Sequence, residues 1–278
     1  MEDKLVFYVS IIKGNLVGII DTYDNIEEFY SVDDIKEFPS YIRINGVLSK
    51  GIKKINLGEA ILTRDIVEKI DCEKELSFEV VDLRDIVKYK LAGARDISDD
   101  FIALETDTSI KLLSSRIIKL KGFNGKGLFK NTKFTKIDFH NTSTSNISDM
   151  RNMFWNCHAT SLDLSSFDTS SVENMWGMFN DCYATSLDLS SFDTSNVEDM
   201  ENMFDGCHAT SLDLSNFDTS KVKVMKNMFK NCQATSLDLS SFNTSNVIYM
   251  RGIFKNYKGI IKSTDNKILK YYSERIID

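Results

Sequence analysis

"CHATSLDLSSFDTSSVENMWGMFND", residues 157–181, is followed at once by a close copy of itself that begins at Cys182. The pattern recurs with a fixed period of 25 residues. Such a period is typical of a solenoid, because one unit is too small to bury its own apolar side chains and must pack against the next. The clearest apolar columns are Ile137, Leu162, Leu187, Leu212 and Leu237; Met150, Met175, Met200, Met225 and Met250; and Phe129, Phe154, Phe179, Phe204, Phe229 and Phe254.

Each unit changes its internal periodicity along the chain. "SLDLS", residues 161–165, alternates apolar and polar side chains and predicts a short strand. "SFDTS", residues 166–170, has the composition of a turn. Val172, Met175, Met178 and Phe179 then have helical spacing, which predicts a short helix or 3₁₀ segment. A capping box of Ser170 and Glu173 is predicted to start it. The predicted class is therefore α/β, a right-handed solenoid of such units with a parallel sheet along one side.

The stretch "FDTSNVEDMENMFDGC", residues 192–207, resembles the BspA-like leucine-rich repeat of bacterial surface proteins. The resemblance covers residues 126–257, about half of the chain. It implies a leucine-rich-repeat-like fold with a parallel sheet. Because members of that family are exported proteins that act in adhesion and partner recognition, it also implies a binding function at the cell surface or outside the cell.

The repeats divide the chain into four predicted parts. Residues 1–115 are predicted to form a small mixed α/β domain, residues 116–136 the N-terminal cap of the solenoid, residues 137–257 the solenoid and residues 258–278 its C-terminal cap. The caps are expected because the outermost repeats would otherwise expose apolar edges.

The first part is predicted in more detail from local patterns. Residues 4–21 indicate a hairpin that turns at Gly14 and Asn15. Helices are predicted over residues 25–38 and 59–70, and strands over residues 76–83, 100–106 and 109–113. An alternative interpretation treats this part as irregular repeats, whose sheet rungs would be "KINL" 54–57, "VVDL" 80–83 and "IIKL" 117–120.

One column of the repeat consists of cysteines, namely Cys157, Cys182, Cys207 and Cys232. Since cysteine is small, apolar and often buried, the column is predicted to hold packed free thiols. Disulfides or a metal site stay open as alternatives, although no C-x-x-C or paired histidine spacing is present. No metal ion or cofactor is predicted.

Aspartates form two further columns. Asp138, Asp163, Asp188, Asp213 and Asp238 are predicted to point outward from the strands. Like charges about 5 Å apart repel, so this row favours a basic peptide, a bound cation or a raised pKa of alternate members. Simple solvated residues are the alternative interpretation. Asp168, Asp193 and Asp218 form the second column and are predicted to accept backbone N–H groups in the turn.

Two tryptophans stand where other repeats have polar residues. Trp155 occupies the position of Asn180 and Asp205, and Trp176 that of Arg151. Both positions are therefore predicted to face solvent, and exposed tryptophan is a preferred anchor at protein interfaces. The alternative is that each ring lies flat over its neighbours. Weaker candidates for the same interface are Tyr183, Tyr249, His158 and His208.

The net charge of −7 argues against nucleic-acid binding and against an anionic membrane surface. Charge is nevertheless divided, since residues 137–211 contain twelve acidic residues and one basic residue, whereas residues 212–262 contain eight basic and three acidic ones. This division favours a partner with a polarised, in part basic, surface or self-association of the chain.

The phosphate-loop, dinucleotide, zinc-protease and serine-hydrolase motifs are all absent from the sequence. We therefore expect a non-enzymatic protein that recognises another protein. One alternative is an intracellular inhibitor of phage or mobile-element origin, such as an anti-CRISPR-like protein or a nucleic-acid mimic. Another is an enzyme whose site lies in residues 1–115. The start of the sequence lacks a basic signal-peptide region, which predicts a cytoplasmic location, and no membrane span is expected.

Overall fold

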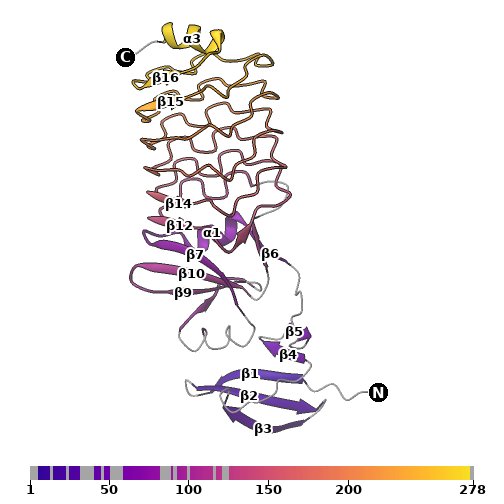
Figure 1. The fold of residues 1–278 in the computed structure, drawn as a ribbon. Coiled ribbons are helices and arrows are strands. Elements are labelled where there is room, and N and C mark those ends of the chain that lie inside the picture. Colours follow the sequence, from indigo (N-terminus) through magenta and orange to yellow (C-terminus); the bar gives the residue numbers. More distant parts are fainter. Residues whose placement is uncertain are drawn as a thin grey trace.

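The structure, a computed structural model, is a mixed α/β fold with mostly parallel sheets and few helices (Figure 1). It describes residues 6–12, 15–22, 25–31, 41–44, 47–50, 59–81, 89, 93–98, 101–114, 117–120 and 125–275.

The first sheet has five strands in the order β3-β2-β1-β4-β5. These strands are β1 (Val6–Ile12), β2 (Asn15–Thr22), β3 (Asn25–Ser31), β4 (Tyr41–Ile44) and β5 (Val47–Lys50). Antiparallel pairing of β1 with β2 confirms the predicted hairpin, whose turn at residues 13–14 lies outside the described residues. The helix predicted over residues 25–38 is wrong for β3, because pairing with β2 outweighs the local helical spacing. Residues 32–38 lie outside the described part.

The helix predicted over residues 59–70 is correct only in its second half. Residues Glu59–Leu62 form strand β6, which pairs in parallel with β11 (Ile117–Leu120) and buries Ala60 and Leu62. Helix α1 (Arg64–Ile70) follows and buries one apolar face. The three predicted strands of this region are confirmed as β7 (Glu75–Val80), β9 (Ile102–Glu105) and β10 (Ser109–Ser114).

A six-stranded sheet runs from this region into the repeats, in the order β14-β12-β7-β10-β9-β8. Its remaining strands are β8 (Arg95–Asp96), β12 (Lys136–Asp138) and β14 (Ser161–Asp163). In the alternative interpretation of irregular repeats, "IIKL" 117–120 is a rung of the sheet. This segment forms strand β11, which pairs in parallel with β6 and β13 (Thr142–Ser143). Residues 54–57 and 82–83 lie outside the described part. The domain boundaries stay a prediction.

The repeats lie one above another, with β12, β14, β15 (Ser236–Asp238) and β16 (Ile260–Lys262) along one side (Figure 1). Parallel bridges at 25-residue intervals, such as Leu187 with Leu212, join the repeats between the named strands. The apolar columns are buried between them. Ring centroids of Phe154, Phe179 and Phe204 are 5.6 and 5.7 Å apart, so each phenylalanine stacks on its copy in the next repeat.

The short helix predicted in each repeat is replaced by consecutive turns. N–H groups alternate in direction: that of Gly177 donates to Glu201 in the next repeat, whereas that of Met178 donates back to Met175. Gly177 and Asp181 have left-handed backbone angles, with φ of 61° and 50°, which a helix does not allow. Equivalent left-handed residues are Gly127, Asn131, Asn152, Asn156, Asn202, Gly206, Asn227, Asn231, Gly252 and Asn256.

The predicted capping box is wrong for the same reason. The N–H of Glu173 donates to the carbonyl of Ser148 in the preceding repeat, and the hydroxyl of Ser170 donates to Asp168. Neither group therefore serves the start of a helix.

A column of buried threonines joins neighbouring repeats through side chains. The hydroxyl of Thr169 donates to the carbonyl of Asp193 and accepts from the N–H of Asp193, both at 2.8 Å. The hydroxyl of Thr169 therefore takes the place of a backbone group in the hydrogen bonding between repeats. The same position is occupied by Thr144, Thr194, Thr219 and Thr244.

The stack ends at helix α3 (Asn266–Ser273), and Asp265 connects the two. One carboxylate oxygen of Asp265 accepts from the hydroxyl and the N–H of Thr244, and the other caps α3 at the N–H groups of Lys267 and Ile268. Burial alone would raise the pKa of Asp265, but these hydrogen bonds lower it. The carboxylate thus substitutes for the repeat that would follow.

We expect Thr169→Val to lower the free energy of unfolding by about 1 to 2 kcal/mol, because it leaves the part-buried N–H and carbonyl of Asp193 without their partner. Chemical denaturation of the full chain measures this loss. Thr185→Val is the matched control, since Thr185 is exposed and should change stability by less than about 0.5 kcal/mol. Equal losses in both variants would contradict a bridging role of Thr169.

Candidate protein-binding face

The strand aspartates lie in tight turns rather than on a free row of charges. One oxygen of Asp163 accepts from the N–H of Ser165 at 3.0 Å, and the copies in the other repeats do the same. Hydrogen bonds from the side chain and backbone of the serine two residues on lower the pKa of Asp163 and Asp188. The raised pKa suggested for alternate members is therefore wrong, and these groups stay ionised.

The last aspartate of this row has a cation beside it. Lys262 stands opposite Asp238 in the sheet, and its Nζ lies 2.8 Å from Oδ2 of Asp238. Hydrogen bonds from Lys262 and Ser240 lower the pKa of Asp238 to about 2. A lysine on the neighbouring rung can thus reach the outer oxygen of an aspartate whose inner oxygen is held by the turn.

The turn aspartates behave as predicted. Asp168, Asp193 and Asp218 accept the N–H of the serine two residues further on, at 2.8 to 3.1 Å. Asn243 occupies the same position in the last repeat and accepts from Ser245 in the same way. A neutral amide therefore suffices for this turn.

A strip of three rings, two exposed and one half-buried, lies beside the strands. His158, Tyr183 and His208 stand at one position of successive repeats, and their centroids are 4.7 and 4.6 Å apart. Tyr183 is 38% exposed. We call these residues the ring strip. The sequence indicated these three rings only as weak candidates, and their 25-residue spacing was the signal that could have joined them into one row.

Trp155 is half-buried, not freely exposed. Nζ of Lys130 lies 3.7 Å from the centre of its ring, and its side chain is hydrogen-bonded to Asp181. Asp205, at the same position two repeats on, is only 8% exposed, so the prediction that this position faces solvent is wrong. Trp176 is half-buried as well. A role of either tryptophan in binding stays a prediction.

Asp181 lies between Trp155 and the ring strip. Its side chain is hydrogen-bonded to that of Trp155, and it precedes Tyr183 by two residues in the sequence. Partial burial and the charge of Asp205 raise the pKa of Asp181. The ring strip thus borders an acidic turn on one side and the ionised strand aspartates on the other.

The division of charge along the repeats coincides with a row of ion pairs between two of them. Such exposed pairs contribute little to stability, but they neutralise charges that would otherwise face a partner. They are Lys223 with Glu198 at 2.6 Å, Lys226 with Glu201 at 2.8 Å and Lys230 with Asp205 at 3.0 Å.

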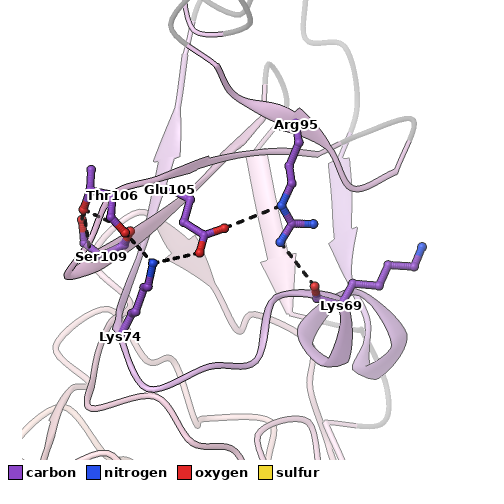
Figure 2. Close-up of polar contacts among 6 residues, drawn as sticks. All are labelled: Lys69, Lys74, Arg95, Glu105, Thr106 and Ser109. Carbon is purple, nitrogen blue, oxygen red and sulfur yellow. Dashed lines mark hydrogen bonds and ion pairs between the residues drawn. The ribbon is translucent and has the colours of Figure 1, made fainter.

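A separate polar cluster joins the elements around β9 (Figure 2). Glu105 lies between Lys74, 2.9 Å away, and Arg95, 3.8 Å away, and Arg95 also donates to the carbonyl of Lys69 at the end of α1. The hydrogen bond between Lys74 and Glu105 raises the pKa of the lysine and lowers that of the glutamate. These contacts hold α1, β8 and β9 together.

The cysteine column consists of buried free thiols, as predicted. Burial raises the pKa of Cys207 to about 12 and that of Cys232 to about 11. Cys157 lies 3.4 Å from the hydroxyl of Thr132. Across the part of the chain that the structure describes, no three His, Cys, Asp or Glu side chains are grouped so as to hold a metal ion.

Comparison with known proteins identifies the repeats. A family model described as "Mycoplasma protein of unknown function, DUF285" matches residues 124–213 and residues 184–271. The two matches overlap and together span more than half of the chain. No curated protein and no solved structure matches it. Within the described residues, no helix has the length and apolar character needed to cross a membrane.

We expect acid to destabilise the chain through its turn carboxylates. Hydrogen bonds from the side chain and backbone of Ser195 lower the pKa of Asp193 in the folded chain, so its stabilising effect is complete above the unfolded pKa of about 3.9 and is lost as the pH falls below it. Asp193→Asn should therefore melt like the wild type at neutral pH, as Asn243 does this naturally, and depend less on pH in acid. Thermal melts from about pH 6 to about pH 2 measure both.

The control for this variant is Asp193→Ala, which removes the acceptor and should cost about 1 kcal/mol at neutral pH. An Asp193→Asn variant that loses melting temperature in acid as steeply as the wild type would contradict the assignment.

We expect the four column cysteines to resist alkylation in the folded chain, because they are buried and their thiol pKa values are raised. Cys72 is only half-buried and should react first with iodoacetamide. Timed labelling followed by mass spectrometry distinguishes the sites, with guanidinium-unfolded chain as the control. Native labelling of Cys182 at the rate of Cys72 would contradict the packing.

Proposed function

Because the chain belongs to the DUF285 family, described as Mycoplasma protein of unknown function, we propose that its repeats carry its function and that this function is not enzymatic. In this proposal the repeats form a right-handed, BspA-like solenoid, and the face with the ring strip binds another protein. The proposal holds for a partner in the cytoplasm and for one at a cell surface alike.

Rigidity of the face supports this proposal. Each repeat donates backbone hydrogen bonds to its neighbour, and buried threonines add side-chain bonds between the same repeats. A surface fixed in this way loses little conformational entropy on binding, so more of the contact energy remains as affinity.

The ring strip is the observation that carries the proposal. The three rings form a continuous row, tilted by 32° between His158 and Tyr183 and stacked between Tyr183 and His208, and Tyr183 at its centre is of a type enriched at interfaces. Rings already stacked on one another have little rotamer freedom left to lose.

The charges around the ring strip favour a partner with a basic surface. The strand aspartates Asp163, Asp188 and Asp213 are held ionised by their turns and lie on the same strands that follow the rings. The contact of Lys262 with Asp238 is an intramolecular example of how an incoming lysine would meet this row. Trp155 and Trp176 are proposed as additional contacts at the margin.

We expect Tyr183→Ala to weaken partner binding about tenfold or more. Truncation of a central aromatic anchor often costs more than about 1.4 kcal/mol of binding free energy, and that energy corresponds to a tenfold change in Kd. A protein captured by the wild-type chain is identified by mass spectrometry, purified and titrated calorimetrically against each variant. Val80→Ala is the control, an exposed apolar side chain on β7 outside the repeats, and should change the Kd less than about twofold. Equal affinities of wild type and Tyr183→Ala would contradict the proposal.

A further inference from the structure

A groove of about 390 Å³ lies at the C-terminal end of the repeats. The last two repeats supply one side of it and the residues at and after α3 supply the other. The charged and aromatic side chains that line it are Lys226, Arg251, Lys255, Tyr271, Glu274 and Arg275. It thus holds four cations and a single carboxylate.

The surroundings of the groove are basic although the chain is acidic. Residues 221–275 contain eleven Lys and Arg against three Asp and Glu, whereas the whole chain has a net charge of −7. Net charge therefore conceals a strongly positive end, whose field attracts anionic groups.

Two of the cations are suited to hold a ligand. The guanidinium of Arg275 is fixed, since it lies 3.7 Å from the centre of the Tyr272 ring and donates to the carbonyls of Tyr272 and Tyr257. Arg251 is exposed, and among the described residues its guanidinium has neither a hydrogen bond nor an ion pair. Lys226, in contrast, is already paired with Glu201.

Exposed apolar side chains lie next to Arg251, on the side of the groove that the repeats supply. Ile248 is 68% exposed and Tyr249 is 63% exposed. They lie three and two residues before Arg251 in the sequence. A bridge between Val224 and Tyr249 places Tyr249 on the same pair of repeats as the groove. Large apolar side chains left open to water beside a charged groove are typical of a protein-binding surface.

We propose that this groove binds an acidic segment of a partner protein. Carboxylates of the segment pair with Arg251 and Arg275, and an apolar side chain of the segment packs on Ile248 and Tyr249. Arginine suits this task because its planar donors match a carboxylate in two-point geometry. The carboxylate of Glu274 within the groove disfavours a polyanion such as a nucleic acid. This site is separate from the ring strip, which lies at a different position of the repeat.

The test uses the full chain and a short fluorescein-labelled peptide in which pairs of glutamates alternate with leucine. Fluorescence anisotropy should show binding by the wild type that weakens as salt is added. Arg251→Glu should weaken it about tenfold or more, and Tyr249→Ala about threefold or more. The controls are Lys133→Glu, which makes the same charge change at an exposed site in the first repeats, and Tyr183→Ala; both should stay within about twofold.

Three results would overturn the proposal. Equal loss in Arg251→Glu and Lys133→Glu would mean that only net charge matters, and equal binding of a glutamine–leucine peptide would mean that carboxylates do not matter. Tighter binding of phosphatidylglycerol vesicles or of an RNA oligonucleotide, lost in Arg251→Glu, would assign the groove to another class of ligand. Loss of peptide binding in Tyr183→Ala alone would place the peptide on the ring strip, so failure here and failure of the proposed function are distinguishable.

Discussion

The hydrogen bonds between backbones of successive repeats are the constraint on which the whole fold depends. In the turn region, alternate N–H groups donate to the next repeat and the others close turns within their own. This alternation requires left-handed residues at two positions of each repeat, and only Gly, Asn and Asp occupy those positions here. At Gly177 the restriction is twofold, since a Cβ would also meet the side-chain oxygen of Asn152 in the preceding repeat.

Strict stacking has a direct consequence for the surface. Whatever side chain a repeat position carries faces its own copy one repeat away, so like residues come together in rows. Phenylalanine, cysteine and threonine benefit from this inside, where rings stack and hydroxyls bridge. Outside, rows of carboxylates would repel, and the turns of the strand aspartates relieve this by giving one oxygen of each a backbone partner. Aromatic copies, in contrast, attract, as the ring strip shows.

Much of the repeat architecture could be predicted from the sequence, because burial repeats with the same period as the residues. Leu162 and Leu164 predicted a strand correctly. The helix was wrong because successive turns also bring Met175, Met178 and Phe179 to one side; Gly177 and Asp181 at left-handed positions were the missed signal. The contact of Trp155 with Lys130 joins the same position of successive repeats, so the 25-residue spacing was the missed signal for it. The groove at α3 involves residues outside the repeat and has no periodic signal.

The cations at the C-terminal end follow from the way the stack is closed. A parallel sheet that ends in an open strand invites another strand to add to it, and lysines on the edge counter this. Lys262 stands opposite Asp238 in the aspartate row, so the last strand reverses the charge of that row. Together with Asp265, which satisfies Thr244 in place of a further repeat, this closes the stack. The cations that close the stack also give this end the positive charge on which the proposed binding of an acidic segment depends.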